Sequence, residues 1–117
     1  MITYYGYKNC GTSKKGEKFL IQHNLDYEFI DITLNPPSRE KLQQIISQSG
    51  KPINKFFNTS GVLYREMQLK NTIKTLTDEA MINLLSQHGK LIKRPLLSDG
   101  TKSSVAFNEQ EFTEIWL

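Results

Sequence analysis

The chain contains one cysteine, Cys10, in the polar segment Asn9-Cys10-Gly11-Thr12-Ser13. A lone cysteine is often a small buried apolar residue, but this segment is polar and lies between an expected strand and an expected helix. The unpaired N–H groups and the positive dipole end of a helix N-terminus favour a thiolate and can also hold an oxyanion. We therefore predict a low thiol pKa and a nucleophilic role for Cys10.

The residues that follow Cys10 determine how a mixed disulfide on its sulfur would be resolved. Ser13 stands where a dithiol enzyme carries a second cysteine, so a thiol from another molecule must resolve a mixed disulfide on Cys10. Ser13 is also a candidate helix N-cap, and the two roles can coexist. Lys14, together with Lys8 and Lys15, adds positive charge that favours the thiolate. The candidate anion-binding residues of the loop are Asn9, Gly11, Thr12, Ser13 and Lys14.

A second candidate lies far along the chain, at Arg94-Pro95. A lone arginine is most often a surface charge, although its planar guanidinium suits an oxyanion or a carboxylate. The proline cannot donate a backbone hydrogen bond to a sheet, which predicts an edge or a special turn here. By itself this pair indicates a site only weakly.

The elements expected around these residues follow an α/β pattern. Residues 1–7 and 27–32 predict strands, and the apolar spacing between them predicts a helix that ends near His23, so Cys10 falls at the helix start of a βαβ unit. Further expected elements are helices over 38–50 and 77–89, a short helical turn over 54–57, a strand over 91–97 interrupted by Pro95, a returning strand over 104–107, and a final helix that starts with a capping box of Asn108 and Glu111.

Composition limits the classes of function. The chain has 117 residues, 38% of them apolar, which suits one domain without a membrane span. Its net charge of +3 is weaker than the signature of a nucleic-acid-binding domain. One cysteine excludes an intrachain disulfide and a cysteine-rich metal site, and no signal peptide is visible. We expect a cytoplasmic monomer with no metal site, no membrane contact and no direct nucleic-acid contact.

Four segments together resemble the arsenate reductase/Spx/MgsR family, in its single-cysteine, arsenate-reductase-like form. They are residues 9–15, 56–61, 91–96 and 106–109. The resemblance covers essentially the whole chain and implies an α/β thioredoxin-like fold in one domain, 1–117. It implies a mixed four-stranded sheet, a core of 1–33 and 90–117, and a helical insertion of 34–89. Such folds place a cis-proline opposite the active cysteine, so Pro95 would line the site and Arg94 would orient an anionic group.

The resemblance also implies an activity. Arsenate reductases of this family attack arsenate with the cysteine and hold it with three arginines. Arg94 matches one arginine, Asn58 stands at the second position, and residues 104–107 lack the third. Each charge-assisted hydrogen bond contributes about 1.5–3 kcal/mol, so weak arsenate reduction is expected. We predict a monothiol thiol–disulfide oxidoreductase without a bound cofactor, with glutathione or glutaredoxin as the co-substrate that resolves the mixed disulfide on Cys10.

The alternative comes from the regulators in the same family. Spx-type members bind the α subunit of RNA polymerase and switch through a Cys-x-x-Cys disulfide, which Ser13 rules out here. Gly50 matches the glycine of the Spx polymerase contact, but a glycine also ends a helix simply by its conformational freedom. The sequence leaves the enzyme and the regulator both open.

Overall fold

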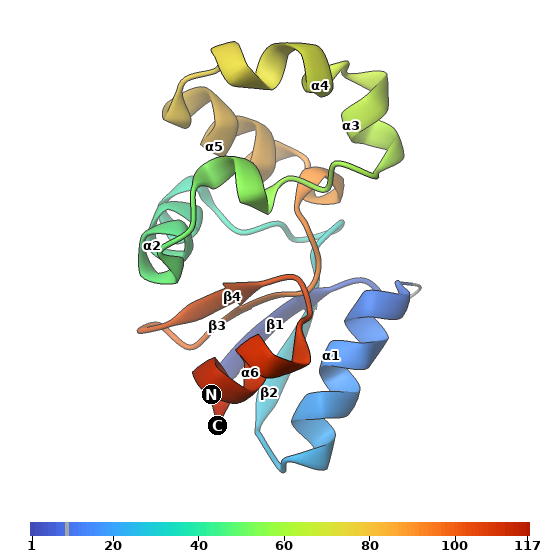
Figure 1. Ribbon diagram of the computed structural model, residues 1–117, viewed down its shortest axis with the longest axis vertical. Helices are drawn as coiled ribbons and strands as arrows, with labels where there is room; N and C mark the ends of the chain where they lie inside the picture. The colour runs from blue at the N-terminus through green and yellow to red at the C-terminus, as the bar shows by residue number, and fades with distance from the viewer. Residues whose placement is uncertain (9) are drawn as a thin grey trace.

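A mixed sheet lies at the centre of the computed structural model, which describes residues 1–8 and 10–117. Within these residues the sheet has four strands in the order β2-β1-β3-β4 (Figure 1). The strands are β1 (Ile2–Gly6), β2 (Tyr27–Asp31), β3 (Leu96–Ser98) and β4 (Ser103–Val105). β1 pairs parallel with β2 and antiparallel with β3, and β3 pairs antiparallel with β4. The predicted α/β fold with a mixed four-stranded sheet is confirmed.

The strands alternate between two cores, because successive side chains of a strand point to opposite faces. Tyr4 and Leu97 pack with α1 (Gly11–Gln22) and α6 (Glu109–Trp116) on one face. Tyr5 and Leu96 face the opposite way, toward the apolar side of the helices between β2 and β3. Figure 1 shows α1 and α6 beside the sheet and these other helices gathered at its far end.

The elements between β2 and β3 form what we call the helical layer, residues 39–91. They are α2 (Arg39–Ser49), a 3-10 helix (Ile53–Phe56), α3 (Val62–Glu66), α4 (Leu69–Thr72), a 3-10 helix (Ile73–Thr75), α5 (Asp78–Gln87) and a 3-10 helix (Gly89–Leu91). Ser38 caps α2 by accepting from the Lys41 N–H, and Gly50 ends it in the left-handed region at φ 70°. In the described part of the chain, no helix is long and apolar enough to cross a membrane.

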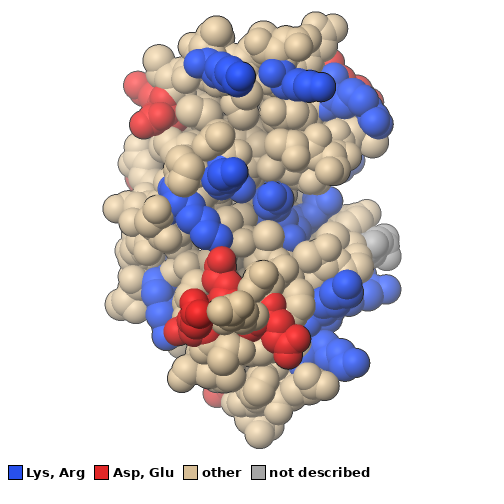
Figure 2. All heavy atoms as spheres, viewed as in Figure 1, with Lys and Arg blue, Asp and Glu red and all other residues tan. Residues whose placement is uncertain are grey.

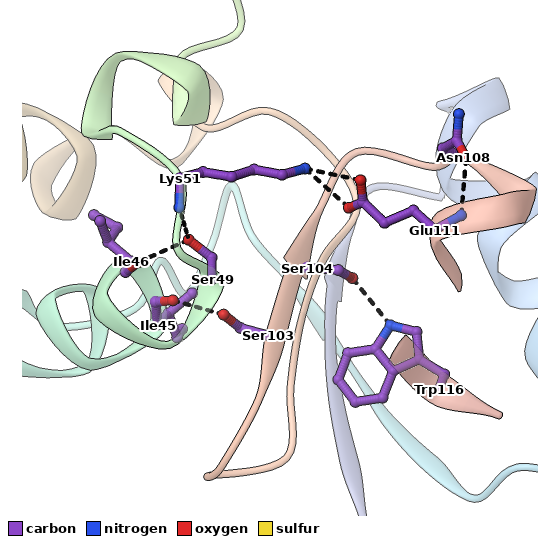
Figure 3. A network of polar contacts seen from close by, with 9 residues as sticks. All are labelled: Ile45, Ile46, Ser49, Lys51, Ser103, Ser104, Asn108, Glu111 and Trp116. Carbon is purple, nitrogen blue, oxygen red and sulfur yellow. Dashed lines mark hydrogen bonds and ion pairs between the residues drawn. The ribbon is translucent and has the colours of Figure 1, made fainter. Parts of the chain in front are cut away.

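Polar contacts attach the helical layer to the sheet (Figure 3). The buried Ser103 hydroxyl donates to the Ile45 carbonyl at 2.6 Å, and Lys51 pairs with the Glu111 carboxylate of α6 at 2.9 Å. On the other face of β4, the Trp116 indole donates to Ser104 at 3.0 Å. Ser103 and Ser104 are neighbouring residues of β4, so their two bonds hold the strand from both of its faces.

The predicted strand over 91–97 is wrong for residues 91–95. Ile92 makes only an isolated bridge with Phe57, the Lys93 N–H donates to the Phe56 carbonyl at 2.8 Å, and β3 begins at Leu96. The buried Pro95 has no N–H for a ladder and instead accepts from the Ala106 N–H at 2.9 Å. A strand therefore cannot run through this segment.

Other boundaries also differ from the sequence prediction. The returning strand ends at Val105, because Ala106 takes a positive φ of 66°. α5 ends at Gln87, and the helical turns between 62 and 75 were not predicted. Asn108 caps α6 by accepting from the Glu111 N–H, but the Glu111 carboxylate pairs with Lys51, so the capping box is formed only in half.

Candidate functional site

Cys10 lies where β1 gives way to α1. Its N–H donates to the Tyr7 carbonyl at 2.9 Å, and its own carbonyl accepts from the Lys14 N–H at 3.1 Å as the first bond of the helix. The backbone of Cys10 is extended, with φ −96° and ψ 122°, as an N-cap residue requires. The half-buried thiol thus belongs to the helix N-terminus that the sequence predicted.

Ser13 fastens this first helical turn to β1. It is fully buried, and its hydroxyl oxygen accepts from the Tyr7 N–H at 3.2 Å. Its carbonyl accepts from the hydroxyl of Tyr4, a residue that is fully buried in the core. Burial raises the pKa of Tyr4, so this hydroxyl stays protonated as a donor. Ser13 is therefore a fixed part of the loop whose own O–H remains able to donate.

The surroundings of Cys10 lower its thiol pKa. Partial burial acts in the opposite direction and is the largest single effect, but the N–H and hydroxyl of Ser13, the N–H of Thr12 and the charge of Arg94 together outweigh it. Donors and a cation stabilise the thiolate more than the neutral thiol. The thiolate, which is the nucleophilic form, is thereby favoured.

Arg94 and Pro95 lie close to the cysteine loop although they are distant from it in the sequence. Their peptide bond is cis, and Pro95 packs on α1, where a Cβ added to Gly16 would lie 3.1 Å from the Pro95 Cγ. The Arg94 guanidinium lies over the Tyr7 ring at 5.6 Å from its centroid. The structure thus brings Arg94 and Pro95 beside the cysteine loop.

The positive charge of Arg94 also acts on the carboxylate of Asp31. Its Oδ1 accepts from the Thr33 hydroxyl at 2.6 Å and from the Thr33 N–H at 2.9 Å. The Thr33 hydroxyl is the main cause of the lowered pKa of Asp31, and Arg94 contributes. Asp31 is consequently ionised at neutral pH, at the end of β2.

A cleft of about 240 Å³ opens beside these residues, and Tyr7 and Arg94 belong to its wall. The complete lining is Tyr7, Thr33, Asn58, Gly61, Val62, Leu63, Lys90 and Arg94. Asn58 is held there because its N–H donates to the Leu91 carbonyl at 2.7 Å. Sequence reasoning missed Tyr7, Thr33 and Lys90 as site residues, since only the fold brings these three segments together.

The remaining predicted site residues lie on the open side of the loop. Gly11, Thr12 and Lys14 are exposed in the first turn of α1, and Asn9 lies outside the described residues. Figure 2 shows Lys and Arg side chains on both sides of the hollow between the helical layer and the sheet. Among the described residues, no group of three or more His, Cys, Asp or Glu side chains could hold a metal ion.

Comparisons with known proteins match nearly the whole chain. The model of the ArsC family matches residues 5–115. The uncharacterised protein YusI of Bacillus subtilis is 43% identical, with 98% of each chain covered. A structure of an ArsC-family-related protein from Bacteroides fragilis is 39% identical with a TM-score of 0.94, and covers 97% of this chain and 95% of its own. A structure described as a possible arsenate reductase from Streptococcus mutans is 35% identical with a TM-score of 0.88, over 97% and 98% of the two chains.

Proteins named as regulators are also similar to this chain, at lower sequence identity. The regulatory protein MgsR of Bacillus subtilis is 25% identical over 97% of this chain and 89% of its own length. The global transcriptional regulator Spx of Streptococcus pyogenes is 23% identical over 95% of this chain and 81% of its own. The likeness therefore extends to proteins named as a reductase and to proteins named as regulators.

Replacing Arg94 with alanine should raise the Cys10 thiol pKa toward its ordinary value of about 8.5, because a cation that favours the thiolate is lost. The rate of alkylation by iodoacetamide, followed against pH, reports this pKa. We expect a midpoint below the ordinary value in the wild type and a higher midpoint in Arg94→Ala.

The control for this experiment is Lys74→Ala, which removes an exposed cation from the far part of the helical layer. Equal midpoints for wild type and Arg94→Ala would show that the guanidinium does not act on the thiol. Thermal melts of both variants distinguish this electrostatic effect from loss of folding.

Proposed function

The chain belongs to the ArsC family, and from this membership and the Cys10 geometry we propose that it is a monothiol thiol–disulfide oxidoreductase. Cys10 is the nucleophile in this proposal, and glutathione or glutaredoxin is the co-substrate. Arg94 orients an anionic group, while the first turn of α1 and Pro95 line the reaction site. Because cytoplasmic thiols supply the reducing partner, we place the protein in the cytoplasm.

The single observation that carries the proposal is the position of Cys10 at a helix N-terminus, with Ser13 at the resolving position. A thiolate attacks a disulfide readily, and a serine cannot displace the group that it acquires. The Cys10 Sγ thiolate bonds to one sulfur of the disulfide, and the other sulfur leaves as a thiolate that takes a proton from water. A second thiol then attacks the mixed disulfide and releases reduced Cys10.

Arsenate is a weaker substrate in this account. Asn58 lies in the same cleft as Arg94 but is neutral, and residues 104–107 contain no arginine. An oxyanion gains charge as it reacts, and removing one preorganised donor typically lowers the rate by roughly 10²–10³. The three-arginine arrangement of arsenate reductases is thus reduced here to one guanidinium.

One observation favours a regulatory role as the second candidate. Gly50 is exposed at the end of α2 and borders an open cavity of about 470 Å³, lined also by Lys51, Pro52 and Asp78. Spx-type regulators bind the RNA polymerase α subunit, and Gly50 matches the glycine of that contact. A pull-down of purified α subunit, with Gly50→Arg as the matched variant, tests this second candidate directly.

Incubation with glutathione disulfide should add one glutathionyl group to the wild-type protein and none to Cys10→Ser. Cys10 is the only cysteine, so intact mass reports the adduct without ambiguity. Glutaredoxin with glutathione should then remove it. An unmodified wild-type mass under conditions where iodoacetamide labels Cys10 would contradict the proposal.

Replacing Asn58 with arginine should raise glutaredoxin-coupled arsenate reduction at least about tenfold, because it restores a cationic donor beside Arg94. Ser60→Arg, which adds the same charge to the exposed neighbouring loop, is the matched control. Wild-type turnover equal to that of a three-arginine enzyme, or no gain in Asn58→Arg, would show that the number of arginines does not limit this reaction.

A further inference from the structure

We infer that the cleft beside Cys10 is a carboxylate-binding subsite in which Lys90 and Arg94 select anionic, peptide-like thiols and disulfides. This inference rests on the proposed thiol chemistry and adds a specificity residue, Lys90, to it. The cleft holds about 240 Å³, which is below the roughly 300–1,000 Å³ of a typical ligand pocket. It therefore accommodates one arm of the ligand while the sulfur of that ligand meets Cys10.

The backbone of Lys90 is held in a defined place on the rim of this cleft. Lys90 belongs to the 3-10 helix Gly89–Leu91. Gly89 packs so tightly on the Ile32 carbonyl that an added Cβ would overlap it, with the Ile32 carbonyl carbon only 2.8 Å away. Leu91 accepts from the Asn58 N–H at 2.7 Å. These contacts on both sides of Lys90 fix the point at which its exposed side chain leaves the backbone.

The charges of the cleft favour an anion. Its lining contains the cations Lys90 and Arg94 and no carboxylate. The salt bridges found in the described part of the chain join Arg39 to Glu79 and Lys51 to Glu111, and neither uses these two cations. Arg94 acts on Asp31 and on the Cys10 thiolate, so Lys90 supplies the additional positive charge that an incoming carboxylate meets.

The rest of the lining suits a peptide-like chain rather than a simple inorganic anion. Val62 is 58% exposed, and Leu63 and the Tyr7 ring are half-buried, which gives the cleft apolar walls. The Asn58 amide can pair with peptide N–H and carbonyl groups, and the Thr33 hydroxyl, whose proton is donated to Asp31, can accept from a peptide N–H. A small peptide carboxylate is the ligand class that uses both the cations and these walls.

Three symmetrical disulfides of different charge test the inference. They are glutathione disulfide, which is anionic, bis(2-hydroxyethyl) disulfide, which is neutral, and cystamine, which is cationic. Rates of Cys10 modification, measured by intact mass, are each divided by the rate of the 2-mercaptoethanol thiolate, which carries no other charge, with the same disulfide. These normalised rates should fall in that order. High salt should narrow the differences, because it screens exposed charges.

Lys90→Gln should lower the normalised rate with glutathione disulfide about two- to fivefold, the upper part of the range for one exposed charge interaction, and leave the rate with the neutral disulfide unchanged. Lys90→Glu should shift the preference further toward cystamine. Lys74→Gln is the matched control, since Lys74 is also exposed and lies outside the cleft.

The results distinguish failure of the carboxylate subsite from failure of the proposed thiol chemistry. Equal normalised rates for all three disulfides in the wild type, or Lys90 variants that behave like Lys74→Gln, would overturn the carboxylate subsite while leaving the thiol chemistry intact. No reaction with any disulfide, at a pH where iodoacetamide labels Cys10, would overturn the subsite and the proposed function together.

Discussion

The attachment of the first turn of α1 to β1 is the constraint on which the site depends. Ser13 is fully buried and accepts from the Tyr7 N–H and the Tyr4 hydroxyl, so the helix N-terminus cannot swing away from the sheet. The close approach of α1 to β1 and to Pro95 is part of this attachment, because a Cβ on Gly16 would collide with the Tyr4 hydroxyl and crowd Pro95. The free N–H groups of the helix are thereby aimed at the Cys10 sulfur before any ligand arrives, which is the preorganisation that anionic nucleophiles need.

The helical layer completes the site from the other side. It contributes Asn58, Lys90 and the apolar wall of the cleft, and it is held to the sheet by the buried bond from Ser103 to Ile45. The ion pair between Lys51 and Glu111 is partly exposed and contributes about 1 kcal/mol or less. Packing and the buried hydrogen bond, rather than this ion pair, therefore determine where the two halves of the cleft meet.

Local patterns in the sequence were sufficient for the first two strands, the cysteine loop and the main caps. The βαβ order, the cap at Ser38 and the glycine stop at Gly50 follow from nearest-neighbour chemistry, which is visible without a fold. The part of the predicted strand before Pro95 and the full capping box at Asn108 were wrong, because tertiary partners took the groups concerned. The Lys93 N–H bonds to the Phe56 carbonyl, and the Glu111 carboxylate bonds to Lys51. Lys90 could not be found from sequence, since its place in the cleft depends on a loop more than 25 residues away.

The most direct test of this account is the Cys10 thiolate absorbance near 240 nm, followed against pH in the wild type and in Ser13→Ala. Alanine removes the hydroxyl that favours the thiolate and leaves the partly buried Tyr7 N–H without its acceptor. We predict a wild-type midpoint below the ordinary value of about 8.5 and a clearly higher midpoint in the variant, with circular dichroism showing that the variant remains folded. A folded Ser13→Ala protein whose thiolate titrates at the wild-type midpoint would contradict the claim that this buried attachment activates Cys10.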